Sequence, residues 1–171
     1  MHLRLNLVAV IAVALLGTGV GTALAGGATS TTAARVSVAQ SPLGRILVDG
    51  RGHTLYLFEK DTNGKSACSG VCVGFWPPLL TRDKPLALAG AKASLLGTTR
   101  RADGRLQVTY NHHPLYTFFE DKKKGQTKGE GLDDFGAEWY AVSASGAKVE
   151  KGSPSSSSTG NDASRSGGYS Y

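Results

Sequence analysis

Several classes of protein are excluded by what this chain of 171 residues lacks. It has only two cysteines, too few for a small scaffold held together by many disulfides. No second long apolar run follows the first residues, so the chain is not a polytopic membrane protein. Its 23 glycines show no three-residue period, which excludes collagen.

Motifs for several familiar activities are also missing. No serine lies in a G-x-S-x-G setting and no G-x-x-x-x-G-K-[ST] loop occurs, which removes the usual acyl-hydrolase and nucleotide-binding interpretations. No basic helix or nucleic-acid motif is present, so we expect no nucleic-acid partner. The formal net charge of +6 favours acidic polymers or anionic surfaces, although ordinary solubility also explains it.

The two ends of the chain differ in composition from its middle. Residues 1–25 combine an early positive charge, an apolar run and an A-x-A motif at 23–25, which predicts a secretory signal peptide. Residues 26–35 are predicted to be a linker, and the Ser- and Gly-rich residues 151–171 a disordered tail. We expect a secreted, extracytoplasmic protein with no lipidation cysteine near the cleavage site and no membrane span after cleavage.

The middle of the chain contains an internal repeat. Residues 46–61 (ILVDGRGHTLYLFEKD) align without gaps to residues 106–121 (LQVTYNHHPLYTFFED), at an offset of 60. Trp76 and Trp139 follow the two copies at comparable places. Such self-similarity indicates two copies of one supersecondary unit. The identical pairs are Val48/Val108, His53/His113, Leu55/Leu115, Tyr56/Tyr116, Phe58/Phe118 and Asp61/Asp121.

Each copy of the repeat is predicted to be a β-hairpin. In the first copy, the turn-forming sequence at 49–52 separates an apolar run from the alternating segment 53–58. Leucines occupy one face of that segment, and Tyr56 and Phe58 the other. Because both faces are apolar, we expect this strand to be covered on both sides.

The second copy repeats this pattern around Asn111-His112-His113-Pro114, where Pro114 belongs at the edge of the turn because it has no N–H to donate. Between the copies, the Ala- and Leu-rich residues 85–96 favour one short helix, and the glycine-rich residues 125–136 an irregular loop.

We therefore predict a mainly β domain over residues 36–150. Its antiparallel strands come from two pseudo-symmetric hairpin repeats at about 44–80 and 104–143, with one short helix between them.

Both copies end in the pattern Y-x-[FWY]-x-x-D, at 56–61 and 116–121. The segments that accompany this motif are KSACSGVC at 65–72, WPPL at 76–79, RADG at 101–104, QVTY at 107–110, PLY at 114–116 and GAEWY at 136–140. Together, the motif and these segments resemble the bacterial "secreted repeat of unknown function" family of predicted lipoproteins. The resemblance implies a secreted, β-rich protein and carries no established activity. The chain departs from the lipoprotein members by lacking a lipidation cysteine, and it has Asn111-His112 where relatives show Asn-Gly.

Cys68 and Cys72 have the spacing C-x3-C. Outside the cytoplasm such a pair is most simply a disulfide, here one that holds the loop leading to Trp76. Two alternatives stay open. One is a copper site that adds His53 or His113 to the two thiolates, and the other is a dithiol redox switch.

His53 and His113 occupy equivalent positions beside the two hairpin turns. A structural role, with the imidazole bonded to a nearby backbone carbonyl, competes with the metal-ligand role. His112 and His113 are adjacent and would point to opposite faces of a strand, so we do not expect both in one site.

Asp61 and Asp121 end the two motif strands. Their carboxylates are suited to accept hydrogen bonds from backbone amides of the following turns. The alternative is a paired acid site for hydrolysis of a sugar or an ester.

The large aromatic side chains are predicted to form the core, because a domain of this size has few others to bury. The alternative is a platform for a carbohydrate or a peptide. This set comprises Tyr56, Phe58, Trp76, Tyr116, Phe118 and Trp139.

The sequence thus favours an exported, non-enzymatic β module of unknown ligand, associated with the envelope or extracellular, with no cofactor. A cell-envelope polymer or protein is the partner we expect. The alternative is an extracytoplasmic copper-binding or thiol-redox protein centred on the C-x3-C pair, and a hydrolase is the third hypothesis.

Overall fold

The computed structural model describes residues 33–150. The predicted signal peptide at 1–25, most of the predicted linker and the predicted tail at 151–171 lie outside the described residues. Within the described residues, no helix is both long and apolar enough to cross a membrane.

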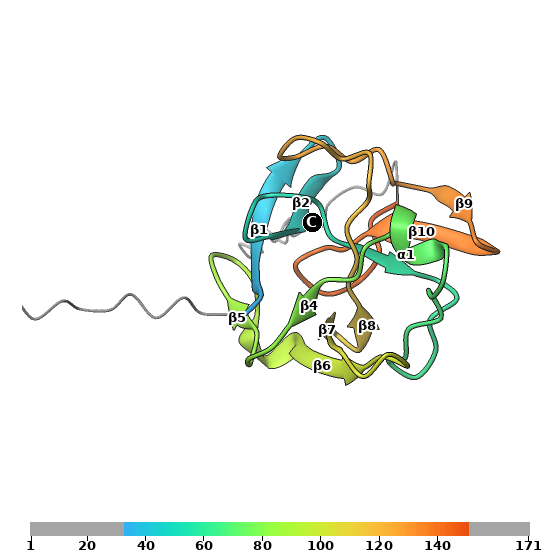
Figure 1. Ribbon diagram of the computed structural model, residues 1–171. Helices are drawn as coiled ribbons and strands as arrows, with labels where there is room; N and C mark the ends of the chain where they lie inside the picture. Colours follow the sequence, from blue (N-terminus) through green and yellow to red (C-terminus); the bar gives the residue numbers. More distant parts are fainter. Residues whose placement is uncertain (1–32, 151–171) are drawn as a thin grey trace, which may run out of the picture. The chain divides into compact units, whose positions relative to one another are not determined.

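The described chain is mainly β, which confirms the predicted fold class. Three sheets surround its interior, with strand orders β2-β1-β5, β3-β10-β9 and β4-β7-β6, and β8 pairs with β7 (Figure 1). All pairings between these strands are antiparallel except that of β1 with β5. The strands are β1 (Arg35–Ser41), β2 (Gly44–Asp49), β3 (Tyr56–Phe58), β4 (Leu80–Thr81), β5 (Leu86–Ala87), β6 (Leu96–Arg100), β7 (Leu106–Tyr110), β8 (His113–Pro114), β9 (Leu132–Asp134) and β10 (Ala137–Ala141).

The first repeat turns where the sequence predicts. Asp49 Oδ1 accepts hydrogen bonds from the amides of Arg51 (2.8 Å) and His53 (2.9 Å), so one carboxylate organises the turn after β2. The chain then passes through Thr54, which forms an isolated β-bridge with Val48, and enters β3. β3 is shorter than the predicted segment 53–58, because only its last three residues pair with β10.

The two faces of this segment enter two different hydrophobic clusters. Leu55 and Leu57 pack in one cluster, and Tyr56 and Phe58 in the other. All four side chains are buried. The prediction of a strand covered on both faces is therefore confirmed.

The second repeat also turns as predicted, but with an unusual backbone. Asn111 (φ 48°) and His112 (φ 67°) both lie in the left-handed region, which the two-residue hairpin between β7 and β8 requires. Asparagine and histidine are both enriched among the few non-glycine residues that adopt this region, although neither reaches it as easily as glycine. Pro114 lies in β8 opposite Thr109, beside the turn.

Two connecting segments differ from expectation. Residues 85–96 contain strand β5 and only one 3-10 turn, η1 (Ala93–Leu95), rather than a continuous helix. The one α-helical turn in residues 33–150 is α1 (Cys72–Phe75), within the first repeat. In the glycine-rich stretch 125–136, β9 pairs with β10. Tertiary pairing at these places overrides local composition.

Candidate functional site

The two repeats meet at their motif tyrosines. Tyr56 N donates to Tyr116 O (2.9 Å), and Tyr116 N donates to Tyr56 O (3.0 Å). This reciprocal bridge joins equivalent residues of the two copies and relates the copies by a local pseudo-twofold axis.

The motif side chains repeat this reciprocity across the axis. Tyr56 Oη donates to Asp121 Oδ2 (2.6 Å), and Tyr116 Oη donates to Asp61 Oδ2 (2.8 Å). Each tyrosine therefore binds the aspartate of the other repeat. Each copy of the Y-x-[FWY]-x-x-D motif therefore supplies one hydroxyl donor and one carboxylate acceptor, and the other copy supplies their partners.

Each aspartate also holds the loop that follows it. Asp61 Oδ1 accepts the amide of Ala67 (2.7 Å), and Asp121 Oδ1 accepts the amide of Lys128 (2.9 Å). This is the amide-capping geometry that the sequence suggests. The two carboxylates bind different tyrosines and different loops.

Burial alters the acidity of these groups. Desolvation raises the pKa of Asp61 to about 6 and also raises the pKa of Asp121. The pKa values of Tyr56 and Tyr116 are raised as well, chiefly by burial and further by the neighbouring carboxylates. Both tyrosines are consequently neutral hydrogen-bond donors across the physiological range.

The aromatic side chains of the motif form one stack through the core. Its order is Phe58, Trp139, Trp76 and Phe118, with successive ring centroids 3.9, 3.9 and 4.4 Å apart. Each tryptophan thus contacts the phenylalanine of the other repeat. Trp76 and Trp139 are fully buried, and Phe58 and Phe118 nearly so, which places these side chains in the core rather than on a surface platform.

Cys68 and Cys72 form a disulfide, as the sequence predicts, with their Cα atoms 5.4 Å apart. Cys72 begins α1, and its carbonyl accepts the amide of Trp76 (2.8 Å). The disulfide therefore braces the turn that delivers Trp76 to the stack. Within residues 33–150, no three His, Cys, Asp or Glu side chains are placed to hold a metal ion.

The two histidines have different surroundings. His53 Nδ1 lies 3.5 Å from Asp49 Oδ2, and His53 lines a hollow together with Asp121. His113 lies in β8, where burial lowers its pKa. The copper hypothesis for Cys68, Cys72, His53 and His113 gains no support from this arrangement.

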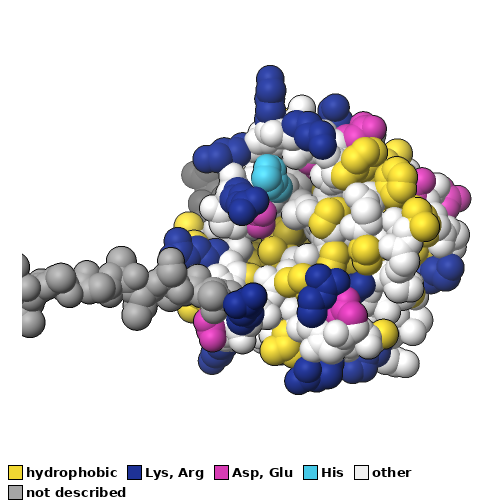
Figure 2. Space-filling view, viewed as in Figure 1, with side chains coloured by type: hydrophobic (Ala, Val, Ile, Leu, Met, Phe, Trp, Pro, Cys, Tyr) yellow, Lys and Arg dark blue, Asp and Glu magenta, His cyan; other side chains and the backbone are white. Residues whose placement is uncertain are grey.

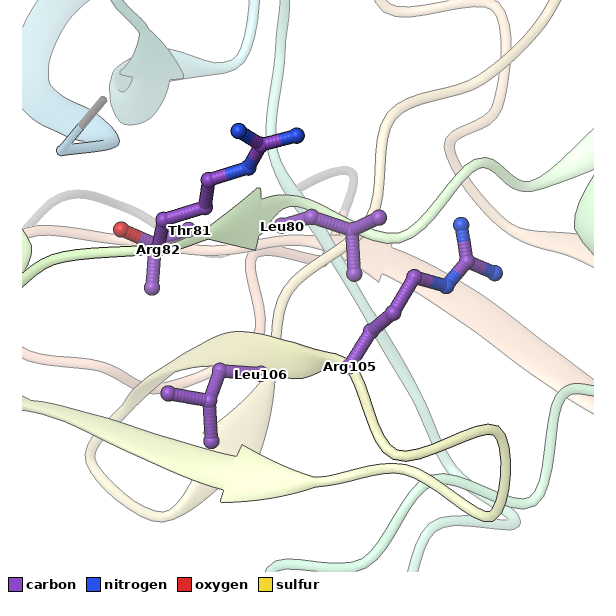
Figure 3. A pocket seen from close by; sticks show the side chains of 5 residues that line it. All are labelled: Leu80, Thr81, Arg82, Arg105 and Leu106. Atoms are coloured by element: carbon purple, nitrogen blue, oxygen red, sulfur yellow. The ribbon is translucent and has the colours of Figure 1, made fainter.

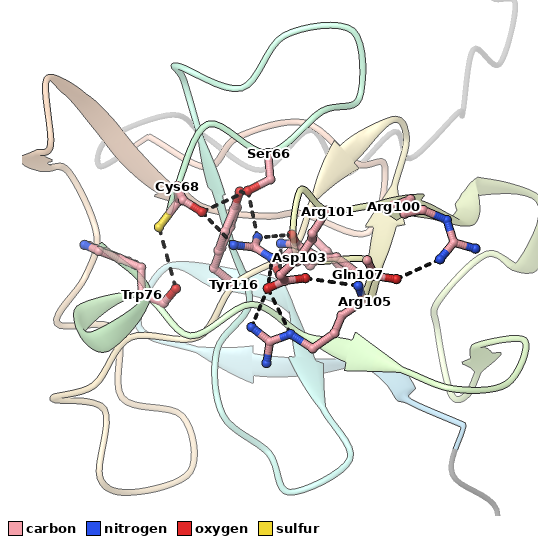
Figure 4. Close-up of polar contacts among 11 residues, drawn as sticks. Ser66, Cys68, Trp76, Arg100, Arg101, Asp103, Arg105, Gln107 and Tyr116 are labelled. Carbon is pink, nitrogen blue, oxygen red and sulfur yellow. Dashed lines mark hydrogen bonds and ion pairs between the residues drawn. The ribbon is translucent and has the colours of Figure 1, made fainter. Parts of the chain in front are cut away.

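Arg101 is a buried charge that the sequence analysis did not single out. Its Nη1 donates to Gln107 Oε1 (2.6 Å) and Ser66 Oγ (2.7 Å), and its Nη2 donates to Cys68 O (2.7 Å). Ser66 Oγ in turn lies 2.8 Å from Tyr116 Oη. Figure 4 shows this network, which ties the disulfide loop to the motif. A lone arginine in a polar segment gives no sequence signal for burial.

A hollow beside this network is lined by two arginines. It has a volume of about 730 Å³ and lies between β4 and the start of β7. Figure 3 shows Arg82 and Arg105 on either side of Leu80, with Leu106 below. We call this hollow the arginine groove; its lining residues are Leu80, Thr81, Arg82, Arg105 and Leu106.

The two arginines of the groove differ in their pairing. Arg105 binds Asp103 Oδ2 through Nε (2.9 Å) and Nη2 (2.6 Å). Arg82 is exposed and forms no hydrogen bond or ion pair with any other described residue. Neither residue stands out as a site in the sequence, because two cations separated by more than twenty positions form no motif.

Fold and contacts together define a β module made of two interlocked copies of one hairpin unit. A family model described as a secreted repeat of unknown function matches residues 37–80 and 97–143, slightly more than half of the chain. The chain belongs to this family, as its motifs predict. The matches begin within β1 and β6, the strands that pair with β2 and β7. No curated protein and no solved structure matches the chain significantly.

Proposed function

We propose that this chain is an exported, non-enzymatic binding module that acts in the envelope or outside the cell. The family is described as secreted, which supports export. The polar groups of the motif are engaged with one another, since each tyrosine hydroxyl donates to an aspartate and each aspartate also accepts a backbone amide. The motif therefore has a structural role, and we expect a ligand to contact other residues on the surface of the domain.

The observation that carries the proposal is the arginine groove. Arg82 projects into it with its guanidinium uncommitted among the described residues, above a floor formed by Leu80 and Leu106. A guanidinium presents planar donors suited to anionic oxygen acceptors, and leucines bind the apolar parts of a ligand. An anionic ligand with apolar stretches fits this combination.

The test is co-sedimentation of the purified, disulfide-intact protein with washed bacterial envelope fragments. We expect Arg82→Ser combined with Arg105→Ser to weaken binding by about tenfold or more. The matched control combines Lys92→Ser with Arg100→Ser, which removes the same charge outside the groove and is expected to bind like the parent protein. Equal losses in both double variants, or release of soluble fragments by the protein, would contradict the proposal.

A further inference from the structure

The arginine groove is one part of a longer depression. It shares Leu80 with a second hollow of about 610 Å³, and that hollow shares Asp49, Arg51 and Thr117 with a third of about 400 Å³. The groove also shares Arg82 and Leu106 with a hollow of about 310 Å³. We call this connected series of four hollows the basic track.

Cations line the basic track from end to end. Each hollow contains at least one Lys or Arg side chain, and Figure 2 shows Lys and Arg side chains around a band of hydrophobic side chains on the viewed face. The cations are Lys84, Arg82, Arg105, Arg35, Arg51 and Lys122.

Three carboxylates also line the track. Asp49 accepts the amides of Arg51 and His53, and Asp121 is buried against Tyr56 Oη. Asp83 is exposed beside Arg82. Cations therefore outnumber carboxylates along the track, and its electrostatic field favours an anionic occupant.

We propose that the basic track binds a linear polymer that carries phosphate groups within its backbone; this inference rests on the proposed binding function. A connected series of hollows fits a strand better than a compact ligand. Figure 3 shows Arg82 and Arg105 on either side of Leu80, so two guanidinium groups flank the arginine groove. Arginine binds phosphate oxygens with paired donors.

The lining also separates this polymer from other anions. Three of the four hollows are lined by no described aromatic residue. Phe118 and Phe119 line only the fourth, so the bases of a single-stranded nucleic acid would find a stacking surface along one part of the track and not along the rest. Leu80 and Leu106 are half-buried in the arginine groove, where an aliphatic part of the polymer can contact them.

The experiment measures binding of the full protein to long-chain polyphosphate and to tripolyphosphate by titration calorimetry. We expect the long chain to bind at least about tenfold more tightly, because it spans several hollows. Arg82→Ser/Arg105→Ser and Arg35→Ser/Arg51→Ser should each weaken long-chain binding by about tenfold. The Lys92→Ser/Arg100→Ser control should leave it unchanged, and circular dichroism verifies that each variant is folded.

Three further probes decide between sources of negative charge. Poly-L-glutamate carries pendant carboxylates, a thymidine oligonucleotide carries bases, and phosphatidylglycerol vesicles present a surface. Tighter binding of any of these, or equal affinity for short and long polyphosphate, would overturn the inference. If the groove variants lose envelope binding while no polyphosphate binds the parent protein, the proposed function stands and only this inference fails.

Discussion

Single side chains in this protein act through partners in the other copy of the repeat. Tyr56 lies within five residues of Asp61 in sequence, yet its hydroxyl binds Asp121. The carboxylate of Asp61 instead accepts a hydrogen bond from the hydroxyl of Tyr116. A motif that looks self-contained in sequence is therefore satisfied only between the two copies.

A double-mutant cycle tests this exchange. Tyr56→Phe and Asp121→Ala should be coupled by about 1–3 kcal/mol, because each removes one partner of the same buried hydrogen bond. Tyr56→Phe and Asp61→Ala, the pair within one repeat, should be additive to within about 0.5 kcal/mol. Urea unfolding of the single and double variants gives both values. Stronger coupling within the repeat than between repeats would refute the interlocked arrangement.

The buried carboxylate of Asp61 predicts a pH dependence of stability. Its pKa of about 6 in the folded protein lies above the usual value of 3.8 for an aspartate, so between these pH values the folded state binds more protons than the unfolded state. The free energy of unfolding should fall as the pH rises from about 4 to about 6, by an amount on the order of 3 kcal/mol.

Asp61→Asn removes this contribution, because the amide does not titrate. The stability of the variant relative to the parent protein should therefore increase over the same pH interval, which thermal melts at several pH values will measure. Asp121, whose pKa is raised in the same direction, keeps its own share in both proteins. Parallel profiles for the two proteins would show that Asp61 does not titrate in this range.

At the level of elements, each hairpin depends on a turn with its own chemistry. The β2 turn relies on the side chain of Asp49, which accepts two amides. The turn between β7 and β8 instead requires two residues with positive φ, and His112 supplies the second. The equivalent strands of the two repeats are thus joined by turns of different design.

Replacement of His112 by glycine should stabilise the protein by about 1 kcal/mol, because a left-handed conformation costs an L-residue roughly that amount. Thr98→Gly, in the exposed middle of β6, is the control and should destabilise, since it adds only chain entropy to the unfolded state. Thermal melts compare the two variants. A loss of stability in His112→Gly would mean that the imidazole makes a contact worth more than the backbone strain.

The described unit as a whole is organised around the aromatic stack. Phe58, Trp139, Trp76 and Phe118 alternate between the two repeats, so neither repeat buries its tryptophan with its own phenylalanine. The disulfide, the buried Arg101 and the Tyr–Asp pairs all lie around this stack and hold its members in place. The ring contacts that stabilise the fold are therefore made between the two repeats rather than within each one.

Truncation of either tryptophan should have a similar effect. Trp76→Ala and Trp139→Ala should each cost about 3–5 kcal/mol, because each removes a large side chain from the centre of the same stack. Urea unfolding measures both, with Phe135→Ala at an exposed turn as the control. A small effect at either tryptophan would show that the stack is not the centre of stability.

Much of the architecture was predictable from local pattern. Alternation at 53–58 placed Tyr56 and Phe58 on one face and the leucines on the other, and turn chemistry located both hairpins. The cysteine spacing indicated the disulfide, and the ordered motifs indicated the family. Each of these features depends on residues that are only a few positions apart in the chain, so it can be recognised in a single sequence.

Only the tertiary structure decided which equivalent residues meet. The partners Tyr56 and Asp121 are 65 positions apart, and Tyr116 and Asp61 are 55 apart. Periodicity assigns a side chain to a face but carries no information about the strand packed against that face. For the same reason Arg82 and Arg105 became a candidate site only when β4 paired with β7, because their proximity arises from that strand pairing and from nothing local to either residue.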